Sequence, residues 1–257
     1  MSADTSYYST SNVRPIAIFT SYMLLCLCLT ILILRALFSK ATLKSSYLSP
    51  SKQQTHHFSP ARSPEFGPLF AALAIISLAT TWHYMLRFFS ASYHSWASTN
   101  DVLPGDNMEL GLWLNDTSLF KEAWGTAVAT PARFWWTQQI FFFTAGWSVV
   151  MGYEGHRRKI PHLWAFMLLG QVVAVSFASN LFFLAVLLSP LRQAEKFTSD
   201  SRIRLTWTPP AVLLAAPLVI TFLSVASIPY TFNSPNFLLM LSVPHIFLFI
   251  PPLLYRI

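Results

Sequence analysis

Long apolar runs separated by short polar segments are the feature that most limits what this chain can fold into. A helix that crosses a membrane needs about 20 mostly apolar residues. Runs of this kind occur near residues 15–38, 66–89, 132–153, 161–188, 210–228 and 236–255. We therefore predict an all-α, polytopic transmembrane helical bundle with about six spans, or seven, that forms a single integral membrane domain over residues 1–257.

The low charge of the chain supports lipid as its solvent. Charged residues make up 11% of the sequence, whereas soluble domains carry about 25%. We expect a multi-pass protein of the endoplasmic reticulum membrane. The net charge of +7 would also suit nucleic acid, but the basic residues lie in short segments between apolar runs, without a basic stripe or a nucleic-acid motif. Nucleic acid is therefore excluded as a partner.

The longest connection between spans, residues 91–130, holds half of the acidic residues of the chain. Asp116 has the side chain of a helix N-cap, and it predicts a short interfacial helix through residues 119–124. Thr130 and Pro131 are the N-cap and first-turn pair that would start the third span.

The charges in the connections between spans do not agree on one orientation of the chain in the membrane. Basic residues place the first and third connections on the cytosolic side, but the fourth connection, which would then be lumenal, is also basic. Asn115 begins the one glycosylation sequon, Asn115-Asp116-Thr117, and its position favours a lumenal 91–130 segment. The basic residues of the fourth connection are Arg192, Lys196, Arg202 and Arg204.

The acids that would support chemistry stand at span ends, at Glu122 and Glu154. Helical spacing places Trp136, Phe143 and Trp147 on the same face as Glu154. A carboxylic acid beside aromatic rings would protonate an alkene or epoxide, and the rings would stabilise the resulting cation. The alternative is an interfacial Glu154 paired with neighbouring arginines and a Glu122 paired with neighbouring Lys121, and spacing by itself favours this structural interpretation.

Polar residues inside the spans are candidates for orienting a substrate oxygen. They are His83, Gln139, Gln171 and Asn180. Interhelical hydrogen bonds explain them equally well. Gly170, Ala174 and Ala178 form a small-residue ridge, which permits close packing of another helix or a partner.

Several motifs in the middle third of the chain resemble fungal integral-membrane terpene cyclases of meroterpenoid pathways, of the type that serve ascofuranone and ascochlorin synthesis. The motifs are Leu-Phe-Lys-Glu-Ala-Trp at 119–124, Phe-Trp-Trp-Thr-Gln-Gln at 134–139, Glu-Gly-His-Arg-Arg at 154–158, His-Leu-Trp-Ala-Phe-Met-Leu-Leu-Gly-Gln at 162–171 and Ser-Phe-Ala-Ser-Asn-Leu-Phe-Phe at 176–183.

The resemblance implies a terpene cyclase of the isomerase or lyase type, which protonates the epoxide of a prenylated (farnesyl) aromatic and needs no metal or other cofactor. Its partners would be this lipophilic substrate, membrane lipid, and the P450s and prenyltransferase of the same pathway. Glu154 and Glu122 are then the catalytic acids, and the aromatic and polar residues named above bind the substrate. The alternative is a non-catalytic membrane carrier, receptor or assembly factor that binds a lipophilic ligand or a partner through the Gly170 ridge.

Overall fold

The computed structural model describes residues 13–47, 66–102, 109–189 and 211–254, and this part of the chain consists of helices with no strand. The predicted all-α bundle is confirmed. Helices that are long and apolar enough to cross a membrane cover Pro15–Ser39, Gly67–Thr99, Ala211–Thr231 and Phe237–Leu254, so the chain is a membrane protein by length and composition. They belong to α1 (Val13–Tyr47), α2 (Gly67–Thr99), α8 (Ala211–Thr231), α9 (Phe237–Phe247) and α10 (Ile250–Leu254).

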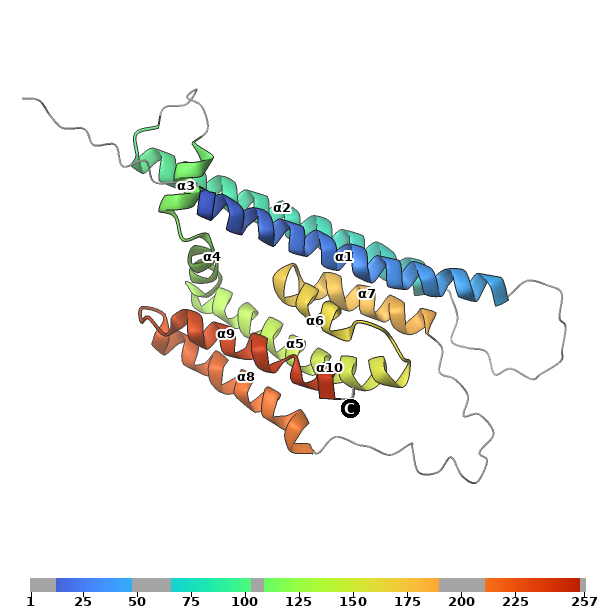
Figure 1. Ribbon diagram of the computed structural model, residues 1–257. Coiled ribbons are helices and arrows are strands. Elements are labelled where there is room, and N and C mark those ends of the chain that lie inside the picture. The colour runs from blue at the N-terminus through green and yellow to red at the C-terminus, as the bar shows by residue number, and fades with distance from the viewer. Residues whose placement is uncertain (1–12, 48–65, 103–108, 190–210, 255–257) are drawn as a thin grey trace, which may run out of the picture.

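The long helices run along one common direction, with α3 and α4 at one end of the bundle (Figure 1). Helix α5 (Pro131–Arg157) lies in the middle and packs against α8 and α10. It begins as predicted, because the Thr130 side chain accepts a hydrogen bond from the Arg133 backbone N–H at 3.3 Å and Pro131 occupies the first turn. At this length α5 extends about 40 Å.

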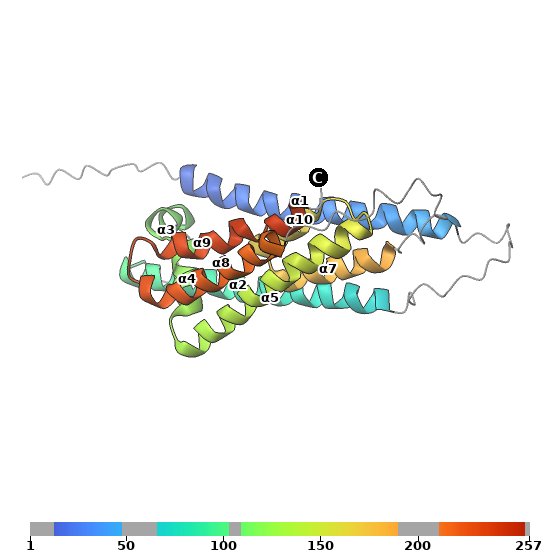
Figure 2. The same cartoon turned by 90° about the horizontal axis from the view of Figure 1, so that it is seen from below.

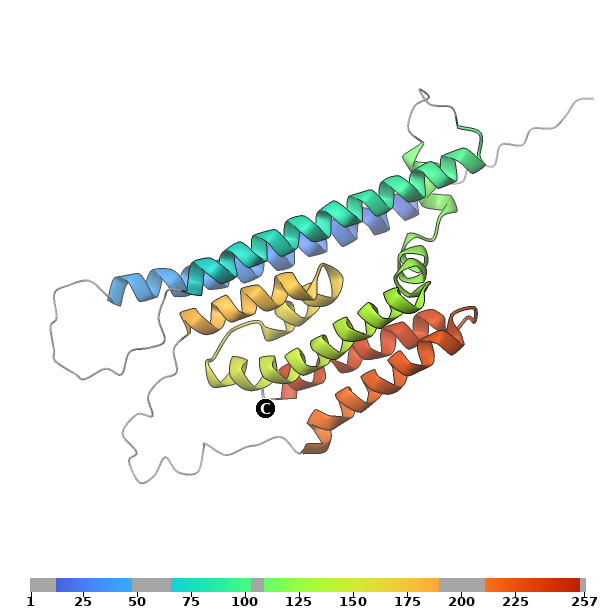
Figure 3. The same cartoon turned by 180° about the vertical axis from the view of Figure 1, so that it is seen from behind.

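The run 161–188, predicted as one span, is instead two helices, α6 (Leu163–Val172) and α7 (Val175–Leu188). The chain reverses at Val173 and the extended Ala174, and α6 and α7 pack against each other as a hairpin (Figure 3). Helix α7 also packs against both α1 and α2 (Figure 2). A long apolar run thus folds back on itself inside the bundle.

The small-residue ridge lies inside this hairpin. A Cβ atom placed on Gly170 would lie 3.4 Å from the Ala178 Cβ and 3.0 Å from Cζ3 of Trp147. The missing side chain therefore lets α6 approach both α7 and α5. Because these residues are already packed within the chain, the ridge does not form a free docking surface.

The tip of the hairpin is fixed by two long-range hydrogen bonds. The Tyr22 hydroxyl of α1 donates to the Val172 carbonyl at 2.5 Å, and Gln171 Nε2 donates to the His245 carbonyl of α9 at 3.0 Å. A helix break surrounded by apolar side chains requires partners for its backbone groups, and Tyr22 supplies one for the Val172 carbonyl, while Gln171 ties the hairpin to α9. The core around the hairpin contains the fully buried side chains of Ile33, Met151, Phe166, Met167, Leu169 and Phe182.

The connection before α5 forms two short helices, α3 (Leu110–Asp116) and α4 (Leu119–Val128). Asp116 does not cap α4: it ends α3, and its carboxylate accepts a hydrogen bond from Trp96 Nε1 at 3.1 Å. Helix α2 continues to Thr99, ten residues past the predicted end at Phe89, because its last turns bury Trp96 and Ala97 against the α3 side of the bundle.

Candidate functional site

Glu154 is held in a structural network at the C-terminal end of α5. Its carboxylate pairs with Arg158 at 2.8 Å and with Arg157 at 3.4 Å. Arg158 also donates to the carbonyls of Val186 and Ser189 at 3.3 and 3.1 Å. The cation thereby joins the end of α5 to the end of α7 and satisfies carbonyls that a helix end leaves open. Both carboxylate oxygens are thus engaged by arginines that belong to the end of α5, so this geometry gives Glu154 an anchoring role.

The aromatic residues that share a face of α5 with Glu154 have different surroundings. Trp147 is 3% exposed and its ring lies 6.3 Å from that of Phe182, whereas Trp136 and Phe143 are 64% and 50% exposed. The difference arises because α6 and α7 cover α5 beside Trp147, while the two exposed rings have no such cover. The structure therefore does not bring the three rings together into one enclosed wall.

Glu122 occupies a different kind of environment, at the junction of α2, α3 and α4. Its Oε1 accepts a hydrogen bond from the Ser118 backbone N–H at 3.0 Å, and its Oε2 accepts one from the Ser92 hydroxyl of α2 at 3.1 Å. Trp113 Nε1 in turn donates to Ser92 Oγ at 3.3 Å. Among the described residues Glu122 makes no ion pair, and its side chain is half-buried. The carboxyl group is thus oriented by hydrogen bonds without a neutralising cation.

Aromatic rings surround this junction. Trp113 makes edge contacts with Tyr93 and Phe89 at centroid distances of 5.8 and 6.3 Å. Tyr93 lies 5.9 Å from Trp96, and all four rings form one apolar cluster. The combination of an acid and several aromatic rings, which the sequence suggested for Glu154, therefore occurs at this junction, where Glu122 is linked to Trp113 through Ser92 and Asp116 accepts from Trp96 Nε1. We call Glu122, Ser92, Phe89, Tyr93, Trp96 and Trp113 the junction site.

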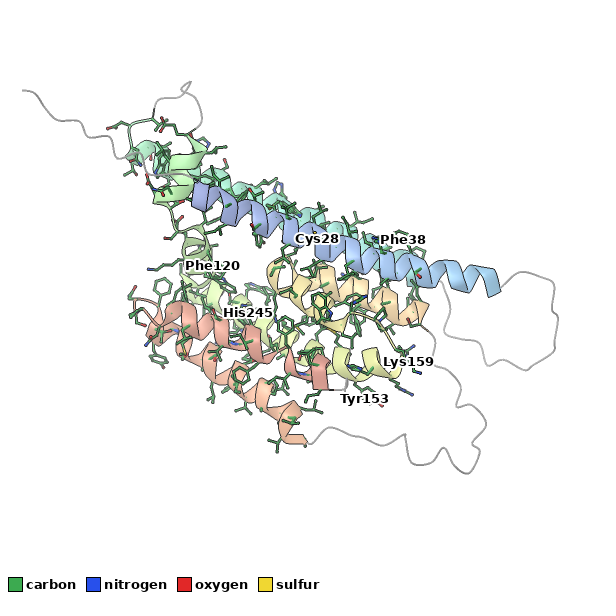
Figure 4. The ribbon with its side chains drawn as sticks, in the orientation of Figure 1. Cys28, Phe38, Phe120, Tyr153, Lys159 and His245 are labelled. Carbon is green, nitrogen blue, oxygen red and sulfur yellow. The ribbon has the colours of Figure 1, made fainter. Side chains whose placement is uncertain are left out.

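The two predicted acids lie far apart. Glu122 precedes α5 and Glu154 lies in its last turn, so the length of α5, about 40 Å, separates their ends of the bundle. Figure 4 marks these two ends by their labelled neighbours, Phe120 on α4 and Tyr153 on α5. One substrate of ordinary size cannot contact both acids, and a single site can use only one of them.

The predicted substrate-binding polar residues do not gather at either acid. Gln171 is engaged with the His245 carbonyl, and Asn180 Nδ2 donates to the Ser176 carbonyl of its own helix at 2.8 Å. Gln139 and His83 are exposed, and the His83 ring lies against Tyr84 at 5.3 Å. The observed contacts of Gln171 and Asn180 are those of structural residues.

A second aromatic group, absent from the sequence-based prediction, surrounds His245 near the hairpin tip (Figure 4). Its half-buried ring lies 5.4 Å from Phe141 and 5.8 Å from Trp124. One signal was available: His245 is a polar residue within the apolar run 236–255. Ser92 and Trp113 carried no comparable signal, because only the tertiary fold joins them to Glu122.

No group of three or more metal-ligating side chains occurs in the part of the chain that the structure describes. No protein-family model, curated protein or solved structure matches the chain. The likeness to membrane terpene cyclases thus stays a prediction from the sequence motifs.

Proposed function

We propose that this chain is a multi-pass protein of the endoplasmic reticulum membrane that cyclises a prenylated aromatic epoxide. The observation that carries the proposal is the junction site, where a carboxyl group that makes no ion pair among the described residues is linked through the Ser92 hydroxyl to a cluster of four aromatic rings. The apolar surface of the surrounding helices suits a lipophilic substrate that arrives from lipid.

In the proposed reaction the acid form of Glu122 donates its proton to the epoxide oxygen. The bond from that oxygen to the more substituted carbon breaks, and its electron pair stays on the new hydroxyl group. An alkene of the same chain attacks the cationic carbon and closes a ring, and the Glu122 carboxylate takes up the proton that the product cation loses. The net change is an isomerisation, driven by relief of the strained epoxide.

The neighbouring residues have separate tasks in this scheme. The π faces of Trp113, Tyr93 and Phe89 stabilise the positive charge of the intermediate. Ser92 is a positioning residue, because its hydroxyl holds one carboxyl oxygen of Glu122 and is itself held by the Trp113 N–H.

Microsomes that contain the protein test the proposal with an epoxyfarnesyl phenol as substrate. We expect Glu122→Gln to lower turnover by about 100-fold or more, the range of a lost general acid. Glu154→Gln and the matched control Glu109→Gln, an exposed acid near the junction site, should retain turnover within a few-fold. Full turnover by Glu122→Gln would refute its assignment as the acid, and no turnover by wild type would refute the cyclase function itself.

A further inference from the structure

The α6–α7 hairpin is too short for either of its helices to cross a membrane. Helix α6 has 10 residues and α7 has 14, which correspond to about 15 and 21 Å against a hydrocarbon core of about 30 Å. Both open ends of the hairpin lie at the end of the bundle where α5 finishes (Figure 3). The chain therefore enters and leaves the hairpin on the same side.

Because the hairpin does not cross, this geometry gives one crossing fewer than the six predicted from hydropathy. Helices α1, α2, α5 and α8, together with α9 and its continuation α10, lie along the common direction and each has one end on the α3–α4 side of the bundle (Figure 1), whereas the hairpin returns to its starting side. The segments that join α1 to α2, α5 to α6 and α7 to α8 then share one side of the membrane. Helices α3 and α4 lie on the other side.

The charges agree with this arrangement. Of the 17 Lys and Arg residues, only Arg14, Arg87, Lys121 and Arg133 belong to the α3–α4 end of the bundle. The others lie in the hairpin-end parts of the described helices or belong in sequence to segments that follow helices ending there, including the basic segment between α7 and α8 that contradicted an orientation with six crossings. If the chain enters and leaves the hairpin on the same side of the membrane, these basic residues share one side, which the excess of positive charge marks as cytosolic. They are Arg35, Lys40, Lys44, Lys52, Arg62, Arg157, Arg158, Lys159, Arg192, Lys196, Arg202, Arg204 and Arg256.

We infer that α6–α7 is a re-entrant hairpin that enters the membrane from the cytosol, and that the α3–α4 end faces the lumen and carries an N-linked glycan on Asn115. Asn115 is exposed near the end of α3, and Thr117 of the sequon follows in extended conformation. The Asn115 side-chain nitrogen bonds to the anomeric carbon of a lipid-linked oligosaccharide. The lipid pyrophosphate departs, and the amide nitrogen loses one proton to a base.

Glycosidase digestion of the full-length protein from eukaryotic cells tests the glycan, with electrophoretic mobility as the readout. Wild type and the control Thr117→Ser, which keeps the sequon, should shift on digestion, and Asn115→Gln should not. Because the readout does not involve turnover, the result is independent of the proposed cyclase function. Wild-type protein that does not shift would overturn the inference.

Two single substitutions create reporter sequons in the Asn115→Gln background. Gln53→Asn produces Asn-Gln-Thr between α1 and α2, and Lys196→Asn produces Asn-Phe-Thr between α7 and α8. Both should stay unglycosylated. Glycosylation at 196 without glycosylation at 53 would show that α6–α7 crosses the membrane, and glycosylation at 53 would show the reverse orientation, so either result would overturn the inference.

Discussion

Gly155 lies where the end of α5 meets the start of the hairpin, and its replacement by alanine tests that contact. A Cβ atom at this position would lie 2.4 and 2.7 Å from the two Cδ atoms of Leu163, the buried first residue of α6. Leu163 would have to move by about 1 Å to restore normal contact. Overpacking of this kind costs about 1–3 kcal/mol of unfolding free energy.

Gly146 on the same helix is the matched control, because a Cβ atom there would meet nothing within 4 Å. Both replacements gain the same helix propensity, about 1 kcal/mol, so the difference between the two variants isolates the contact with Leu163. At about 2–4 °C per kcal/mol, Gly155→Ala should melt about 2–12 °C below Gly146→Ala. The measurement is thermal unfolding of detergent-solubilised protein followed by tryptophan fluorescence. Equal melting temperatures would refute the packing of α6 against α5.

Three further substitutions probe hydrogen bonds that hold the fold. Tyr22→Phe leaves the Val172 carbonyl at the hairpin tip without its donor and should cost about 1–3 kcal/mol of stability, whereas Tyr230→Phe, at a side chain that is 90% exposed, should leave the melting temperature unchanged. Thr130→Ala removes the N-cap of α5 and should cost about 1 kcal/mol, seen as a lower melting temperature; an unchanged value would contradict the cap. Arg158→Gln should lower the melting temperature while turnover per folded molecule stays constant, and a parallel loss of turnover would place this end of α5 in the reaction.

The helical bundle was predictable because hydropathy over about 20 residues identifies segments suited to lipid. The start of α5 was also predictable, since Thr130 and Pro131 act locally. The α6–α7 hairpin was not predictable. Hydropathy reports an apolar environment without reporting the direction of the chain, and the reversal at Val173 and Ala174 contains neither glycine nor proline. Tertiary hydrogen bonds to α1 and α9, rather than local turn residues, hold the break.

The candidate site was likewise predictable only in part. Helical periodicity correctly predicts which residues share a face of α5, but it cannot tell which part of that face another helix will cover. Trp147 is therefore buried and Trp136 exposed. The surroundings of Glu122 depend on Ser92 and Trp113, which are 30 and 9 residues away in sequence. Contacts across such distances leave no periodic pattern that a single sequence would reveal.

Product analysis tests the central claim most directly. Membranes that contain the protein, supplied with an epoxyfarnesyl phenol, should yield a cyclic product of unchanged mass that carries one new hydroxyl group or ether ring. Glu122→Gln membranes with the same amount of protein should form this product at a rate about 100-fold lower. If wild-type membranes leave the epoxide intact, or give only the diol that water forms in empty membranes, the protein is not a cyclase of this substrate class.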